Sequence, residues 1–330
     1  MKAVAYEKYG SPDVLRVIDV PVPAPGPGEV LVRVRAVSLN AWDWDTLTGR
    51  PLEYRVLSGL CRPRHRLIHG CDIAGVVESV GAGVSGFRRG DPVLGDLAED
   101  GWGAFAEFVC APETRLAHKP AGMSFEQAAC ISHGGNLAIQ GLFDHGHIDK
   151  ARRVLINGGG GSTGSLAIQL ARTYDVELSC VDHARKLDQM RALGADHVID
   201  YARHDFTRSG VRYDLIFDVR TSRGVFEIAR ALAPAGRYVT VGGKTSRLLQ
   251  MLALRRLTGH PMQMVAYQPN KDLPQLLSLF EQGRVCPVID RCFDLERTVD
   301  AFRLYGSGAF FGKIVVRVGD AAVSSGSDSG

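Results

Sequence analysis

The sequence lacks any apolar run near the roughly 20 residues needed to cross a bilayer. Its first ten residues, MKAVAYEKYG, also contain no apolar signal core. We therefore expect a cytoplasmic protein without a membrane partner. A block of basic residues interleaved with aromatics is absent too, and the net charge is only +3 over 330 residues. No nucleic-acid partner is expected from such a composition.

Paired cysteines are also missing. The seven cysteines are an odd number without a C-x-x-C pair, in a chain long enough not to need disulfides. We predict reduced thiols. With 45% hydrophobic and 23% charged residues, the composition is that of a globular protein, and the length suits two domains. Residues 319–330 are small and polar, which predicts a disordered tail.

Glycine is concentrated in VLINGGGGSTG, residues 154–164. The apolar run at its start is typical of a strand buried on both faces. Three of the glycines then follow the spacing G-x-G-x-x-G, which lets the backbone approach a pyrophosphate. The amphipathic stretch that follows predicts a helix whose first amides face those phosphates. The residues assigned to this loop and first helical turn are Gly159, Gly161, Ser162, Thr163 and Gly164.

Strands and helices alternate beyond this loop. Strand-like segments lie at 176–181, 197–200, 213–219 and 237–243. An isolated glycine motif is found in many ordinary turns, but this alternation is typical of a doubly wound parallel sheet. The two features together predict a Rossmann dinucleotide-binding domain in an α/β protein.

The choice between NADPH and NADH depends on the end of the second strand. Asp182, about 18 residues beyond Gly164, would accept hydrogen bonds from the ribose of NADH. His183, Arg185 and Lys186 follow it and would favour the 2′-phosphate of NADPH, although they are also ordinary for a solvated helix start. We predict NADPH, with NADH as the alternative.

The two ends of the chain have a different character. Residues 1–123 are rich in short strands broken by proline and glycine, and VLVRVRAV alternates like a half-exposed antiparallel strand. A serine cap at Ser124 opens a helical pattern that glycines interrupt at 134 and 135. We place the Rossmann domain at 124–266. Residues 267–318, with a helix closed by Gly306 and a last strand GKIVVRV, are expected to return to the first domain.

The chain resembles the medium-chain dehydrogenase/reductase superfamily, in its zinc-independent quinone oxidoreductase-like branch. The resemblance is carried by GEVLVRVRAVSLNAWDW, GCDIAGVVESVGAGVSGFRRGDPVLG, GAFAEFVCAPE, VLINGGGGSTGSLAIQLA, LGADHVIDY and GKIVVRV. It implies a β-rich GroES-like catalytic domain completed by the C-terminus, a cleft at its junction with the Rossmann domain, hydride transfer from a nicotinamide, and a homodimer. It also implies that Tyr201 helps to hold a 2′-phosphate.

Zinc-dependent members of that superfamily carry a catalytic metal on three side chains. Those positions fall on Asn40, Cys71 and His133 here. An amide oxygen is a poor zinc ligand, whereas cysteine and histidine are good ones, yet both are also commonplace in packed structure. The four-cysteine lobe of zinc-dependent relatives is absent. We predict no metal.

A site without a metal must polarise its substrate by hydrogen bonds, which suits quinones and α,β-unsaturated carbonyls as small-molecule substrates. Asn40 and Asp43 are predicted to lie across the cleft, or equally to form a turn. Tyr54 and His133 are the candidate proton donors, although bulk water would also serve a quinone. Val241, Gly242 and Gly243 are predicted to hold the nicotinamide, and Val219 is predicted to contact the cofactor.

The sequence thus predicts an NAD(P)H-dependent oxidoreductase that reduces quinones or enones. Two alternatives stay open. One is an alcohol or aldehyde dehydrogenase assisted by a metal on Cys71 and His133, and the other is an NADPH-binding protein without turnover.

Overall fold

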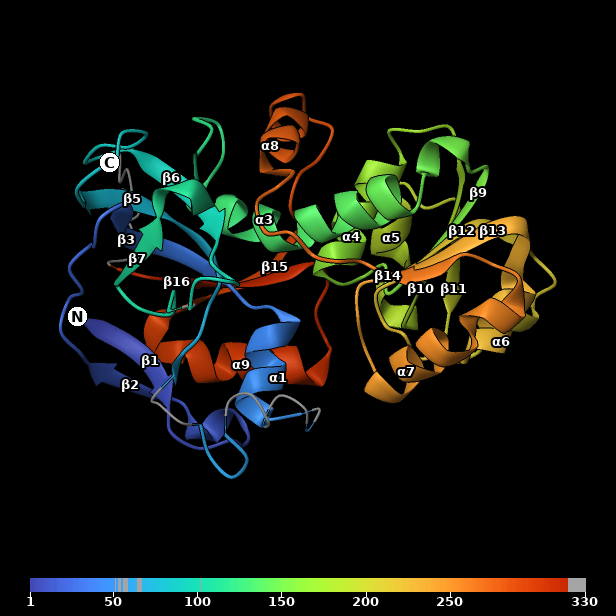
Figure 1. Cartoon of the computed structure of the whole chain (residues 1–330), viewed down its shortest axis with the longest axis horizontal. Helices are drawn as coiled ribbons and strands as arrows, with labels where there is room; N and C mark the ends of the chain where they lie inside the picture. The colour runs from blue at the N-terminus through green and yellow to red at the C-terminus, as the bar shows by residue number, and fades with distance from the viewer. Residues whose placement is uncertain (51, 53–54, 56–58, 64–66, 102, 320–330) are drawn as a thin grey trace, which may run out of the picture.

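The computed structural model describes residues 1–319 except 51, 53–54, 56–58, 64–66 and 102. Tyr54 and residues 320–330 of the predicted tail therefore lie outside the described residues. Two lobes, each built around a sheet, lie side by side along the longest axis (Figure 1). No helix of the described chain combines the length and the apolar character needed to span a membrane. All seven cysteines are free thiols, as predicted.

A six-stranded parallel sheet forms the centre of one lobe. Its strand order is β11-β10-β9-β12-β13-β14, which confirms the doubly wound prediction. Five strands match the predicted segments, but the edge strand β14 was not predicted. The bounds are β9 (Arg153–Asn157), β10 (Glu177–Asp182), β11 (His197–Asp200), β12 (Tyr213–Asp218), β13 (Leu232–Thr240) and β14 (Met262–Met264).

Helices cover both faces of this sheet. Val154 and Ile156 of β9 pack into the core formed with α3, α4 and α5, while Leu155 packs into the core formed with α6 and α7. A strand buried on both faces has to be apolar at every position, which explains its continuous apolar run. The bounds are α3 (Phe125–Ile139), α4 (Ser162–Ala171), α5 (Leu187–Ala192), α6 (Val225–Ala231) and α7 (Thr245–Leu254).

Helix α3 corrects one prediction, because it is not interrupted at Gly134 and Gly135. A Cβ on Gly134 would lie 2.6 Å from the Ser162 hydroxyl, and one on Gly135 would lie 2.7 Å from the Leu276 side chain. These glycines therefore permit close packing rather than ending the helix. Beyond Ile139 the helix continues as a π-helical turn, Gln140–His145.

The other lobe is built on antiparallel pairing around β3 (Glu29–Ser38). Its larger sheet has the order β15-β16-β3-β5-β6-β8, with β7 also paired to β3, and a smaller sheet has the order β2-β1-β4. The remaining bounds are β1 (Lys2–Tyr6), β2 (Arg16–Asp19), β4 (Leu67–Ile68), β5 (Asp72–Val80), β6 (Pro92–Asp96), β7 (Phe108–Pro112), β8 (Leu116–His118), β15 (Ile289–Asp294) and β16 (Lys313–Arg317).

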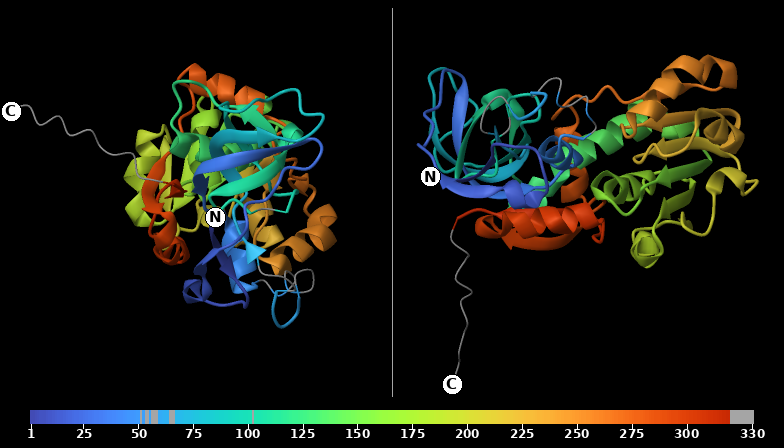
Figure 2. Two further views of the ribbon diagram at one scale, coloured as in Figure 1. Left: turned by 90° about the vertical axis from the view of Figure 1, so that its left-hand side faces the viewer. Right: turned by 90° about the horizontal axis from the view of Figure 1, so that it is seen from below.

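The C-terminal strands return to this lobe, since β16 pairs with β3. Figure 2 shows the last helix and strands against the N-terminal elements, with the Rossmann helices at the opposite end. The predicted end of the last helix is wrong: α9 (Thr298–Ser307) continues through Gly306 and ends at Ser307, with Gly308 as its C-cap. A Cβ on Gly306 would lie 2.1 Å from the ring of Trp44, so this glycine lets α9 pack against α1 (Ala41–Thr48).

Helix α3 lies at the junction of the lobes, because it packs against β3 and β5 as well as against α4 and α8 (Leu273–Glu281). The domain limits at 123/124, 266/267 and 318/319 stay a prediction.

Candidate active site

The glycine loop joins β9 to α4 as predicted. A Cβ on Gly164 would lie 2.1 Å from the carbonyl oxygen of Gly158, so the close approach of helix and turn requires glycine there. The Ser162 hydroxyl, at the first turn of α4, is buried and has no hydrogen-bond partner among the described residues. A buried orphan hydroxyl beside free helix amides fits a phosphate ligand.

The residues predicted for the nicotinamide, together with the cofactor residue Val219, lie at the same edge of the sheet as this loop. Val219 follows β12, and Val241 to Gly243 follow β13, at the carboxyl ends of neighbouring parallel strands. A Cβ on Gly242 would meet no atom within 4 Å, so this backbone borders open space. In open α/β sheets ligands bind outside this edge. A nicotinamide dinucleotide therefore fits the residues present.

Asp182 is turned back toward the glycine loop. Its Oδ2 accepts a hydrogen bond from the Gly160 amide at 2.9 Å, and its Oδ1 accepts one from the His183 amide at 2.8 Å. The ammonium of Lys186 lies 3.7 Å from Oδ1. The carboxylate that would repel a 2′-phosphate is thus engaged by the protein itself.

The predicted phosphate ligands lie close to this aspartate. The rings of His183 and Tyr201 make an edge contact with centroids 5.9 Å apart. Arg185 Nη2 donates to the carbonyl of Gly308 at 2.9 Å, which connects the loop after β10 to the end of α9. The structure therefore brings the predicted residues together at one corner of the sheet.

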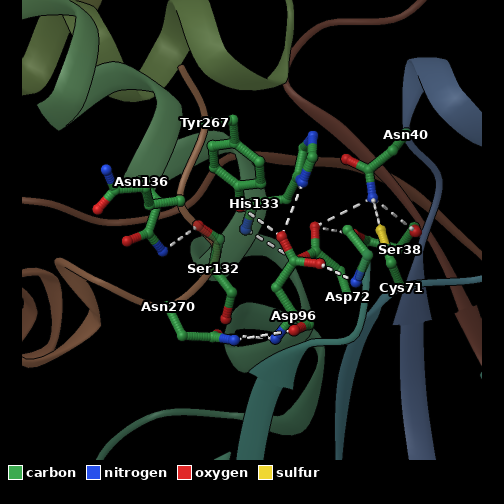
Figure 3. A network of polar contacts seen from close by, with 12 residues as sticks. Ser38, Asn40, Cys71, Asp72, Asp96, Ser132, His133, Asn136, Tyr267 and Asn270 are labelled. Atoms are coloured by element: carbon green, nitrogen blue, oxygen red, sulfur yellow. Dashed lines mark hydrogen bonds and ion pairs between the residues drawn. The ribbon is translucent and has the colours of Figure 1, made fainter. Parts of the chain in front are cut away.

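His133 lies in a buried polar network at the junction (Figure 3). Its Nδ1 is 2.8 Å from Asp96 Oδ2, and the Tyr267 hydroxyl donates to the same oxygen. A carboxylate only accepts, so Nδ1 carries a proton. Burial alone would lower the pKa of His133, but the charge and hydrogen bond of Asp96 outweigh it and raise that pKa. Nε2 makes no hydrogen bond within the described chain.

The second part of the network surrounds Lys313, the first residue of β16. The buried ammonium donates to Ser38 Oγ at 2.8 Å, to Asn40 Oδ1 at 2.6 Å and to Asp72 Oδ2 at 2.8 Å. Burial alone would lower the pKa of Lys313, but the carboxylate of Asp72 raises it, so the lysine stays charged. The amide oxygen of Asn40 therefore binds the ammonium of Lys313. Its Nδ2 also donates to Cys71 Sγ at 3.4 Å.

Asp43 has a local role. Its Oδ2 accepts from the Asn40 amide at 2.8 Å, and its Oδ1 accepts from the Gly70 amide at 3.0 Å. Burial raises the pKa of Asp43 to about 7. Both oxygens are engaged by backbone, so this aspartate secures the start of α1.

The two neighbouring tryptophans differ in their surroundings. Trp42 is partly exposed and meets the ring of His133 edge-on, with centroids 6.0 Å apart. Trp44 packs against Tyr305 of α9. Of these two tryptophans, Trp42 is therefore the one that can form an aromatic wall beside His133.

Sequence reasoning did not identify Asp72, Asp96, Tyr267 or Lys313. One feature of the sequence could have indicated Lys313 and Asp72, namely a charged residue at the start of an apolar strand. Charged residues are rarely buried without a partner, so each of these two suggests the other kind of charge nearby. Lys313 opens the strand KIVVR, and Asp72 opens a strand that is buried over its first four residues.

Cys71, Asp96 and His133 offer a sulfur, an oxygen and a nitrogen within 4.8 Å of one another. These ligand types suit Zn²⁺, which would act there as a Lewis acid. Burial, with the charges of Asp96 and Asp72, raises the pKa of the Cys71 thiol. A metal would therefore have to displace the thiol proton.

Two family profiles match the chain. One, described as an alcohol dehydrogenase GroES-like domain, covers residues 26–121, and the other, described as a zinc-binding dehydrogenase, covers residues 193–316. The 2-methylene-furan-3-one reductase of Solanum lycopersicum is 32% identical, over 96% of this chain and 79% of that protein. The chloroplastic NADPH-dependent alkenal/one oxidoreductase of Arabidopsis thaliana is 31% identical, over 76% of this chain and 63% of that protein.

The fold of this chain is similar to that of a solved quinone oxidoreductase. The quinone oxidoreductase of Coxiella burnetii superimposes with a TM-score of 0.87 at 28% identity, over 97% of this chain and 99% of that one. Sequence and structure agree over nearly the whole described length. The chain belongs to the medium-chain dehydrogenase/reductase superfamily of oxidoreductases, in its quinone oxidoreductase-like branch.

Proposed function

We propose that this protein reduces quinones or α,β-unsaturated carbonyls with NADPH, and that His133 supplies the proton. The observation that carries the proposal is the position of His133 between the lobes. It is held by Asp96, while the next residue, Gly134, packs against Ser162 of the phosphate loop. The relatives, a 2-methylene-furan-3-one reductase, an alkenal/one oxidoreductase and a quinone oxidoreductase, support this substrate class.

Bound NADPH supplies a hydride to the electrophilic carbon of the substrate. For an enone, the electron pair of the carbon–carbon double bond moves toward the carbonyl and leaves an enolate, which then needs one proton. His133 Nε2–H has no hydrogen-bond partner among the described residues and can donate it, while Asp96 stabilises the imidazolium beforehand. Water then returns a proton to the histidine. For a quinone the reduced oxygens can take protons from water.

The direct test is loss of nicotinamide absorbance on adding an enone or a quinone to purified protein with NADPH. Oxidation of NADPH by either substrate supports the proposal. Tight NADPH binding without turnover over a broad substrate panel would favour the non-catalytic alternative instead.

The homodimer and the cytoplasmic location stay predictions. Light scattering of the purified protein tests the homodimer.

A preference for NADPH is the finer part of the proposal. Arg185→Gln should weaken NADPH binding about tenfold and leave NADH binding within twofold, because only NADPH carries the phosphate that this cation would neutralise. Fluorescence titration with both cofactors measures the two constants. An equal loss for both cofactors would mean that Arg185 acts through its bond to Gly308.

The reaction should also depend on pH through His133. Because Asp96 raises the pKa of this histidine, the donor keeps its proton to a higher pH than an ordinary histidine does, and kcat for enones should fall as pH rises through the raised pKa. Asp96→Asn removes the carboxylate charge, so the descending limb should move to lower pH. The pH profile of kcat for both proteins is the measurement, and an unmoved limb would contradict the assignment.

A metal-assisted alcohol dehydrogenase is the second candidate, and the grouping of Cys71, Asp96 and His133 favours it. Metal analysis of protein purified without chelators distinguishes this metal-assisted dehydrogenase from the reductase proposed above. Stoichiometric zinc together with alcohol oxidation would support this candidate. Turnover of enones that survives chelator treatment would support the first.

A further inference from the structure

Asp96 is held by the short segment between β14 and α8. Tyr267 and Asn270 of this segment both bind it, Tyr267 at the carboxylate and Asn270 at the main chain. The Asn270 amide oxygen accepts from the Asp96 amide at 2.9 Å, and the Asn270 amide nitrogen donates to the Asp96 carbonyl at 2.8 Å. Figure 3 shows this side chain facing the main chain of Asp96. The segment thus fixes both the position of Asp96 and the direction of its carboxylate.

The pair between Asn270 and Asp96 takes the place of a strand contact. Strand β8 pairs with residues 93–95 of β6, and Asp96 is the next and last residue of β6. A side-chain amide carries both a donor and an acceptor, so it can pair with a main-chain N–H and C=O as a neighbouring strand would. Loss of the Asn270 side chain would therefore leave the end of β6 without two of its hydrogen bonds.

The backbone of Asn270 adopts the left-handed conformation, with a φ of 61°. Residues other than glycine rarely adopt it, although asparagine tolerates it better than most. Such a conformation persists where the surrounding contacts over-determine it, and it is concentrated at functional sites. Glycine reaches the same φ without strain. Asn270→Gly therefore removes the amide and keeps the course of the backbone.

Helix α3 anchors the same segment from the other side. Gln140, in the π-helical turn that continues α3, accepts from the Gln268 amide at 3.0 Å and donates to the Gln268 carbonyl at 2.8 Å. His133 lies in α3 itself, seven residues earlier. The contacts form a closed ring that runs from α3 through the segment to Asp96 and back to His133.

We propose that Asn270 is a positioning residue, which holds Asp96 where its carboxylate orients the imidazole of His133 for proton transfer. The inference rests on the proposed function, in which His133 supplies the proton to an enolate. Proton transfer requires the donor within hydrogen-bond reach of its acceptor, so a displaced imidazole lowers the rate although the histidine is present.

Steady-state kinetics of Asn270→Gly with NADPH tests the positioning. We expect kcat for an enone to fall about 10- to 100-fold, since misplacing a reacting group by about 1 Å can cost about 10²-fold. For a quinone, kcat should fall less than threefold, because water protonates the reduced oxygens. KM for the enone and the affinity for NADPH should stay within twofold, because the substitution acts on the proton donor. Equal losses for enone and quinone would overturn the proposal.

Combining Asn270→Gly with His133→Gln shows whether Asn270 acts through the histidine. In that case the double variant should be no slower toward enones than His133→Gln alone. Losses that multiply would overturn the proposal, because Asn270 would then contribute without His133.

Thermal unfolding midpoints show whether each variant is folded at the assay temperature. If Asn270→Gly is not, Asn270→Asp replaces it. Aspartate also tolerates the left-handed conformation and keeps an acceptor for the Asp96 amide, but it cannot donate to the carbonyl. This variant should show a smaller loss with the same selectivity for enones, and a loss without that selectivity would overturn the proposal.

Gln140→Met is the matched control, since it releases the same segment from α3 without touching Asp96. Gln268 is exposed, so water can bind its main chain in this variant. We expect kcat for enones to stay within threefold. A loss equal to that of Asn270→Gly would overturn the proposal, because any loosening of the segment would then be sufficient.

The single variant His133→Gln distinguishes a failure of this inference from a failure of the proposed function. Enone reduction as fast as that of the unaltered protein would contradict His133 as the donor, and the positioning with it. Slow enone reduction by His133→Gln together with normal reduction by Asn270→Gly would leave the donor in place and contradict the positioning alone.

Discussion

His133→Gln should lower kcat for enone reduction by about 10²- to 10⁴-fold, the range that a positioned general acid contributes. Glutamine has a comparable reach and can still donate a hydrogen bond to Asp96, but it cannot deliver a proton. The loss should appear in kcat more than in KM, because the proton is needed only after hydride transfer has begun. Steady-state kinetics with saturating NADPH measures both constants.

Quinone reduction by the same variant is the internal control. Since the reduced oxygens of a quinone take protons rapidly from water, kcat for a quinone should fall less than tenfold. NADPH affinity and the thermal unfolding midpoint should also stay close to those of the unaltered protein. An equal loss for both substrates would show that His133 supports the structure of the site rather than proton transfer.

Lys313→Met should lower the free energy of unfolding by about 3–5 kcal/mol, the usual result of removing one partner from a buried ion pair. Methionine fills similar space, but it leaves the carboxylate of Asp72 buried without its cation. The exposed fraction of Lys313 is only 2%, so water cannot replace the lost ammonium without rearrangement. Urea unfolding followed by circular dichroism gives the change.

A double-mutant cycle isolates the ion pair. Adding Asp72→Asn to Lys313→Met should recover part of the lost stability, because no unpaired charge then remains buried. Arg317→Gln, in the same strand, is the matched control, since Arg317 pairs with Glu126 at the surface and its loss should cost about 0–1 kcal/mol. Equal costs at 313 and 317 would contradict the argument.

Two of the elements that differ from the prediction are β14 and α3, and each difference has a physical cause. Strand β14 has three residues, too few to show a period. The glycines at 134 and 135 suggested a break in α3, but contacts with Ser162 and Leu276 make small residues necessary inside the helix. Tertiary packing overrode the local preference in that case.

The Rossmann strands, the glycine loop and the position of Asp182 could be predicted from the sequence because their signals are local. A strand buried on both faces must be apolar throughout, and a helix residue that closely approaches the preceding turn must be glycine, as Gly164 shows. Such constraints act between residues a few positions apart, so the spacing of residues in the sequence is enough to predict these elements.

The buried network depended on the tertiary structure. The register of β3 places Ser38 opposite Asp72 and beside Val315, and this pairing brings Lys313 to Asp72 from 241 residues away. Asp96 similarly meets His133 and Tyr267 only where β6, α3 and the segment after β14 converge. No periodicity encodes these contacts, because the partners are joined by sheet register and packing rather than by chain distance. The sequence by itself predicted a dinucleotide loop and named His133 as a candidate donor, whereas only the tertiary structure placed Asp96 and Tyr267 beside that histidine.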